Sequence, residues 1–221
     1  MKKFFDAIRK GDTDTVRTLI AAKPELVGCV AGKTPAKDVG QSPLQVALKA
    51  GAFDIANLLL DAGADLNFME DPSCGSAWRA PVLHDAINAA VMCSRWNVNS
   101  DALGGFRVCS TPERADVARN VLRRMLAGGA DVNACDSHGN SGLWRFCLQA
   151  AQILPRYDWR EHREMDDRIF TRELHDDLLA VLDLLWDAGA DPAYAAPHFG
   201  VSPLEYYREG SLALLLREVF A

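Results

Sequence analysis

One stretch decides the fold: Leu58-Leu59-Leu60-Asp61-Ala62-Gly63-Ala64-Asp65-Leu66-Asn67. The chain repeats this stop phrase as Met125-Leu126-Ala127-Gly128-Gly129-Ala130-Asp131-Val132-Asn133 and again as Leu184-Leu185-Trp186-Asp187-Ala188-Gly189-Ala190-Asp191-Pro192. Each copy is an apolar helical run followed by a glycine, which can adopt the left-handed conformation that ends a helix. The aspartate after the glycine can accept a hydrogen bond from nearby backbone in a turn. A helix end that recurs three times predicts a repeat architecture.

A second phrase, the opening phrase, alternates with the stop phrase. Its copies begin at Ser42-Pro43-Leu44-Gln45, Pro81-Val82-Leu83-His84, Ser141-Gly142-Leu143-Trp144 and Ser202-Pro203-Leu204-Glu205. Serine suits the N-cap of a helix, and proline suits the first helical position, where its missing N–H is not needed. Together the two phrases resemble the ankyrin repeat, a pair of helices followed by a β-turn finger. The resemblance implies an all-α fold, an ankyrin-repeat solenoid of about five helix-turn-helix repeats.

The resemblance covers nearly the whole chain, so residues 1–221 are expected to form a single ankyrin-repeat domain. We expect the repeats at about residues 3–27, 41–67, 78–133, 141–193 and 202–221. The glycines of the stop phrases lie 66 and 60 positions apart, close to two repeats of about 33 residues. A two-repeat interpretation of the first interval is therefore an alternative. Because this interval contains one opening phrase and no further stop or opening phrase, one enlarged repeat is favoured.

The enlarged repeats predict insertions in repeats three and four. The first insertion covers about residues 96–110 and the second about residues 155–173. High charge combined with aromatic side chains predicts that the second insertion is ordered or partly helical. Insertions in a repeat protein project on one face and often take part in binding.

Charge is unevenly spread over the chain. Residues 1–50 carry nine positive and five negative charges, whereas the whole chain of 221 residues has a formal net charge of −6, so residues 51–221 carry −10. An acidic body argues against nucleic acid or an anionic membrane as the partner. It favours a protein with a basic patch.

Location is predicted from what the sequence lacks. No secretory leader and no apolar run of about 20 residues is found. The six cysteines form neither close pairs nor a compact framework, which is typical of a reduced, cytoplasmic protein.

Two groups of residues are candidates for a catalytic or a metal site. His84, Asp85 and Cys93 are the residue types of a thiol nucleophile with a base, but His84 occupies the position of the ankyrin histidine, which ties neighbouring turns together, and Cys93 lies in an apolar run, where it acts as a small hydrophobe. His162 and Asp166 would share one helical face, where a salt-bridged surface is favoured over a metal site. We therefore expect no catalytic residue, no metal and no cofactor, and hence no enzyme.

Aromatic and arginine residues outside the ankyrin consensus are the predicted partner-binding residues, because such side chains dominate binding hot spots. They are Trp78, Arg79, Trp96, Phe106, Arg107, Trp144, Arg145, Tyr157, Trp159 and Arg160. The competing interpretation is that these rings only anchor the insertions on the solenoid. Trp186, in the third stop phrase, is predicted to lie in the core.

The sequence therefore predicts a cytoplasmic protein-binding ankyrin-repeat protein, an inhibitor or adaptor that covers a functional surface of its partner. Two alternatives stay open. One is an enzyme or effector whose site is built from residues 155–173 and His84, and the other is a structural module that assembles with itself.

Overall fold

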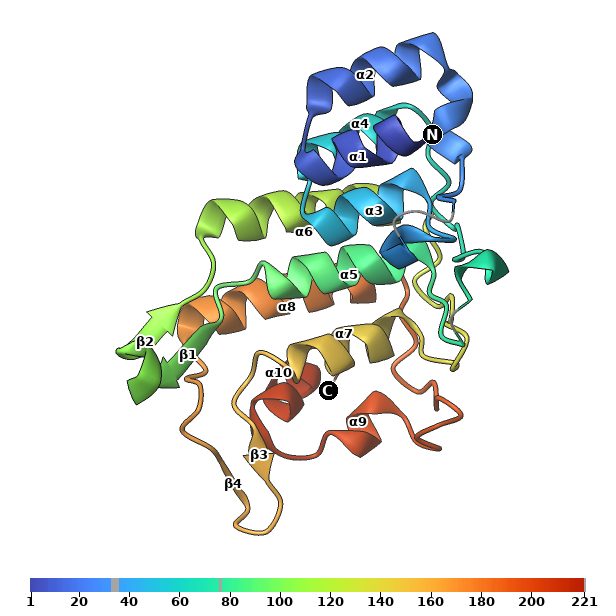
Figure 1. Cartoon of the computed structure of the whole chain (residues 1–221). Coiled ribbons are helices and arrows are strands. Elements are labelled where there is room, and N and C mark those ends of the chain that lie inside the picture. Colours follow the sequence, from blue (N-terminus) through green and yellow to red (C-terminus); the bar gives the residue numbers. More distant parts are fainter. Residues whose placement is uncertain (33–35, 76, 221) are drawn as a thin grey trace.

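The computed structural model describes residues 1–32, 36–75 and 77–220, and helices dominate them (Figure 1). The α-helices follow one another in pairs: α1 (Lys2–Lys10) and α2 (Thr13–Ala22), α3 (Pro43–Ala50) and α4 (Phe53–Asp61), α5 (Val82–Met92) and α6 (Pro112–Ala127), α7 (Gly142–Ala150) and α8 (Arg172–Asp187), α9 (Pro203–Tyr206) and α10 (Gly210–Phe220). Short 3₁₀ helices are η1 (Pro24–Gly28), η2 (Ala36–Asp38), η3 (Pro72–Cys74) and η4 (Asp101–Leu103). The glycines and the proline of residues 28–40 predict a loop, and residues 33–35 of that stretch lie outside the described residues.

Successive pairs stack into two layers. In the first layer α1, α3, α5 and α7 contact one another in that order, and in the second α2, α4, α6 and α8 do the same (Figure 1). The last pair continues this order, because α9 contacts α7 and α10 contacts α8. Contacts between neighbouring pairs are the defining property of an α-helical repeat protein, so that part of the predicted fold class is confirmed.

The helix ends follow the phrases. The helices α4, α6 and α8 each end two residues before a glycine, and the φ angles of Gly63, Gly129 and Gly189, 81°, 96° and 84°, are left-handed. Ser42 and Ser202 each form a capping box, with Gln45 and Glu205 respectively. These side chains satisfy backbone N–H groups that the first turn of a helix leaves without partners.

Asparagines join one stop phrase to the next. Asn67 donates from Nδ2 to the Gly129 carbonyl at 3.2 Å and accepts from the Asp131 N–H at 2.8 Å. Asn133 makes the same two bonds to Gly189 and Asp191, at 2.9 and 3.0 Å. The three copies of the stop phrase are thus bonded directly in sequence order.

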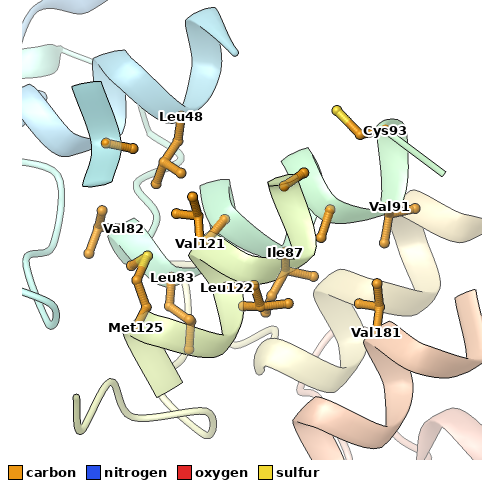
Figure 2. Packing of buried hydrophobic residues seen from close by; sticks show 14 of the residues in the cluster. Leu48, Val82, Leu83, Ile87, Val91, Cys93, Val121, Leu122, Met125 and Val181 are labelled. Atoms are coloured by element: carbon orange, nitrogen blue, oxygen red, sulfur yellow. The ribbon is translucent and has the colours of Figure 1, made fainter. Parts of the chain in front are cut away.

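The core lies between the two layers. Figure 2 shows Leu83 and Ile87 of α5 packed beside Leu122 and Met125 of α6. All four side chains are at most 1% exposed. Trp186 departs from the prediction, because its side chain is 46% exposed and packs edge-on against Phe220, with ring centroids 5.1 Å apart.

Two of the interhelical connections each carry a short β-hairpin. Between α5 and α6, β1 (Asn97–Ser100) pairs antiparallel with β2 (Gly105–Val108). Between α7 and α8, β3 (Tyr157–Asp158) pairs antiparallel with β4 (Arg163–Glu164). The second segment is ordered as predicted but not helical before α8, so His162 and Asp166 do not share a helical face. His162 lies in the turn between the strands, with a φ of 50°.

Candidate partner-binding surface

Some of the predicted binding residues point inward and join loops to one another. The Trp78 indole donates to Oδ2 of Asp136 at 2.9 Å, and the Arg145 guanidinium donates to the same oxygen at 3.0 Å while it lies over the Trp78 ring, 5.2 Å from the centroid. Burial by itself would raise the pKa of Asp136, but hydrogen bonds from Asn140 and Trp78 lower it to about 2. Asp136 therefore stays ionised and holds three segments together.

Trp144 is the most enclosed of the predicted binding residues. Its ring is fully buried in α7, stacks on Phe199 with centroids 4.1 Å apart and donates from Nε1 to the Tyr194 carbonyl at 3.2 Å. The Trp144 ring is therefore not accessible to a partner protein. Arg79 is bound through its backbone, because its N–H donates to the Ser137 hydroxyl at 2.9 Å.

The hairpins carry the outward-pointing members. Phe106 on β2 is 48% exposed and Trp159, in the turn after β3, is 57% exposed, and Arg107 and Arg160 beside them are also exposed. Trp96, at the base of the first hairpin, is only partly buried and donates from Nε1 to the Met92 carbonyl at 3.1 Å.

The two hairpin segments are bonded to each other although they lie far apart in sequence. Asn97 of β1 donates to the Ile169 carbonyl at 2.7 Å and accepts from the Ile169 N–H at 2.8 Å. Asn99 adds bonds to the carbonyls of Asp167 and Asp166. Residues 97–108 and 157–169 therefore form one continuous feature, which we call the hairpin surface. Its exposed large apolar side chains are Phe106, Val108, Trp159, Met165 and Ile169.

A surface hollow lies beside α3 and α5. It has a volume of about 350 Å³ and includes Lys49, Asp85 and Met92 in its lining. Burial raises the pKa of Asp85 to about 7, even though the Lys49 ammonium lies 3.7 Å away and opposes that shift. Gln45 donates to the same carboxyl group at 3.0 Å. Asp85 was a candidate by residue type alone, and the burial of its carboxyl group was not predictable, because its neighbours Gln45 and Lys49 come from another repeat.

His84 and Cys93 do not form a catalytic pair. Nine positions along α5 separate them by about 13 Å. His84 Nε2 donates to the Ala134 carbonyl in the next turn at 3.1 Å, which confirms its predicted linking role. Burial lowers the pKa of His84 to about 4 and raises the pKa of the Cys93 thiol, so the first is a weak base and the second a poor nucleophile at neutral pH.

Metal-binding clusters and membrane-spanning helices are both absent from the described part of the chain. Residues 1–32, 36–75 and 77–220 contain no group of three or more His, Cys, Asp or Glu side chains placed to hold a metal ion. Over the same residues, no helix combines the length and the apolar character needed to cross a membrane.

The fold defines the class of protein as an α-helical repeat protein that carries two hairpins bonded to each other. Within it, residues 39–71 match the family model described as Ankyrin repeat, which confirms the resemblance inferred from the phrases. These residues hold α3, α4 and the first stop phrase. No curated protein matches the chain. Ankyrin repeats are modules of protein–protein interaction and are generally not catalytic.

Proposed function

We propose that this chain is a cytoplasmic, non-catalytic protein that binds another protein and covers its functional surface, as an inhibitor or adaptor. The observation that carries the proposal is the hairpin surface, where Phe106 and Trp159 expose large rings on segments that the helix stack does not require. Exposed aromatic side chains on a positioned support are typical binding anchors.

The proposal includes the repeat organisation. It counts about five repeats in a single domain over residues 1–221, at about 3–27, 41–67, 78–133, 141–193 and 202–221. Repeats three and four are enlarged by the hairpin segments. Direct bonding of Asn67 to Gly129 and Asp131 supports one enlarged repeat over two ordinary ones, because a repeat between them would separate these residues.

The contact residues we propose are Phe106, Arg107, Tyr157, Trp159 and Arg160. We assign Trp78, Trp144 and Arg145 to the support, because their rings and charges already have partners inside the fold. The acidic charge of residues 51–221 favours a basic patch on the partner.

The experiment is affinity capture from the native host with the whole tagged chain, followed by mass spectrometry of stoichiometric partners. The double variant Phe106→Ala/Trp159→Ala should lose the partner while its circular dichroism stays unchanged. A matched control is Leu214→Ala, since Leu214 is 58% exposed but lies on α10, outside residues 97–108 and 157–169. Capture by the double variant at the level of the control would contradict the proposal. With a partner in hand, loss of its activity at equimolar chain separates an inhibitor from an adaptor.

A further inference from the structure

A preformed pocket lies where the second hairpin meets the start of α10. Its volume is about 580 Å³, and it is lined from residues 151–164 and 206–212. Oε1 of Glu164 accepts hydrogen bonds from both the backbone N–H and the hydroxyl of Ser211, each at 2.6 Å. Gly210 permits this approach, because a Cβ there would lie 3.1 Å from Glu164 Oε1 and 3.2 Å from the Tyr157 ring. The hydrogen bonds between Glu164 and Ser211 thus fix the second hairpin relative to α10, on the two sides of the pocket.

Aromatic rings form the walls of this pocket. Tyr157 and Trp159 meet edge to face with centroids 4.8 Å apart, and Tyr206 and Tyr207 do so at 4.9 Å. Trp159 is 57% exposed and Tyr206 is 46% exposed, so both rings are accessible to a ligand. Part of the lining is apolar and buried, because Leu154 and Leu212 also border the pocket. We refer to these two side chains as its floor.

Carboxylates give the pocket a negative character. Within the described part of the chain, Glu209 has no hydrogen-bond or ion-pair partner, and Oε2 of Glu164 accepts no hydrogen bond. Their charges add to the effect of burial in raising the pKa of Tyr157. The basic residue among the described lining residues, Arg156, pairs with Asp167 at 3.0 Å, a carboxylate that also pairs with Arg168. The two carboxylates of Glu164 and Glu209 outnumber this one guanidinium in the lining.

We infer that this pocket binds an arginine side chain of the partner protein. The inference rests on the proposed function and names the chemistry by which one site of the hairpin surface recognises its partner. An arginine fits each part of the pocket: its guanidinium stacks on the aromatic faces and donates to the free carboxylate oxygens, and its methylene stem packs on the apolar floor.

Lysine and uncharged side chains fit less well. A lysine ammonium is compact and strongly hydrated, so it cannot stack flat on a ring and bond to two carboxylates at once. An apolar side chain would leave the carboxylates of Glu164 and Glu209 desolvated without a partner. Arginine should therefore bind more tightly than either.

The test uses arginine amide as the probe, titrated into the whole ¹⁵N-labelled chain and followed by NMR. Of the five tryptophans only Trp159 lines the pocket, so its indole N–H, assigned with Trp159→Phe, reports on the site. Saturable shifts of that indole and of the Ser211 amide are expected with arginine amide. Citrulline amide, which has the same shape without the charge, and lysine amide should bind at least about fivefold more weakly.

Variants of the lining residues test whether the carboxylate and the aromatic ring contribute to arginine amide binding. Glu209→Gln should weaken arginine amide binding about fivefold, and Trp159→Ala, followed at Ser211, should weaken it about tenfold. Glu161→Gln is the matched control, because Glu161 lies in the same hairpin but does not line the pocket, and it should leave binding unchanged. Equal binding of citrulline or lysine amide, an unaffected Glu209→Gln variant, or no saturable shift would overturn the inference.

This test is independent of partner capture. If a partner is captured through the hairpin surface but arginine amide does not bind, the inference fails and the proposed function stands. If arginine amide binds selectively but the double variant Phe106→Ala/Trp159→Ala captures the same partner as the Leu214→Ala control, the proposed function fails while the pocket keeps its ligand.

Discussion

At the scale of single residues, Asp136 is a loop residue whose carboxylate connects several parts of the fold by hydrogen bonds. The carboxylate accepts hydrogen bonds from Trp78, Asn140, His138 and Arg145, and its side chain is fully buried. Removing it leaves the Arg145 charge without its partner, so we expect Asp136→Ala to lower the free energy of unfolding by about 3 to 5 kcal/mol. Urea denaturation measures the loss.

The pH dependence of that loss follows from the direction of the shift. The folded pKa of Asp136, about 2, is below its ordinary value of 3.8, so its contribution is present above about pH 4 and disappears as the pH falls towards 2. The difference between the native chain and Asp136→Ala should therefore shrink over that range. Asp187→Ala, an exposed carboxylate, is the control and should change stability by less than about 0.5 kcal/mol at any pH.

His175 is a second titrating residue, and its effect has the opposite sign. Nδ1 lies 3.1 Å from Asp176 and Nε2 lies 2.8 Å from Glu218 on α10, and these hydrogen bonds raise the pKa of His175 above 6.5. Its stabilisation is therefore complete below about pH 6.5 and is lost as the pH rises through the folded pKa. Thermal unfolding should show that His175→Ala costs up to about 1 kcal/mol at pH 5.5 and less at pH 8.5. Glu218→Gln should weaken that pH dependence, and an equal effect at both pH values would argue against the ion pair.

At the scale of secondary-structure elements, the start of α7 shows why the third opening phrase departs from the others. Gly142 stands where two other copies have proline, and its N–H donates to the Val132 carbonyl at 3.1 Å. A Cβ at this position would lie only 2.5 Å from that carbonyl oxygen. Restoring the phrase with Gly142→Pro should thus destabilise the chain by roughly 2 to 5 kcal/mol, through a lost bond and a backbone clash. Gly28→Ala, with open space around its Cβ, is the control, and denaturation midpoints of the two variants decide the matter.

The two hairpins depend on one buried asparagine. Asn97 is fully buried and exchanges two hydrogen bonds with Ile169, whereas Asn99 is exposed and its side chain makes one bond, to Asp166 at 3.2 Å. Asn97→Ala removes both hydrogen bonds to the Ile169 backbone, which are partly buried, and this costs about 1 to 3 kcal/mol. Hydrogen exchange of residues 166–170 should become faster in Asn97→Ala and change little in Asn99→Ala. The same rate in both variants would mean that the hairpins are held by other contacts.

The elements also show how far the sequence alone could reach. Helix pairs and their ends were predictable, because caps, glycines and apolar spacing act locally, as at Ser42 and Gly63. The hairpins were not, since strands of two to four residues are too short for a pattern. The aromatic residues drew attention to the insertions, but the sequence could not show which rings point inward and which point outward. Tertiary packing decides this, because it buries Trp144 and exposes Trp159. The pocket was missed because Tyr206 and Glu209 meet the second hairpin only in the folded chain.

At the scale of the whole molecule, stacking makes stability a sum over neighbours, and the ends have only one neighbour each. The second helix, α2, buries only Val16, whereas α6 buries five side chains. Local opening should therefore start at α2. We therefore expect the central repeats, which carry the hairpin surface, to open less readily than α2, and a support that stays closed preserves the geometry of a binding site.

Charge acts over the same scale and gives a prediction about kinetics. Residues 51–221, which include the hairpin surface, carry a net charge of −10, whereas Phe106 and Trp159 offer apolar contacts of short range. Long-range attraction is screened within about 8 Å at physiological salt, but short apolar contacts are not. Stopped-flow association with the captured partner should thus slow about tenfold between low and high salt, with little change in the dissociation rate. Phe106→Ala/Trp159→Ala should instead speed dissociation and leave the salt dependence of association intact. An association rate that does not respond to salt would mean that the acidic body serves solubility and that recognition depends on the hairpin surface alone.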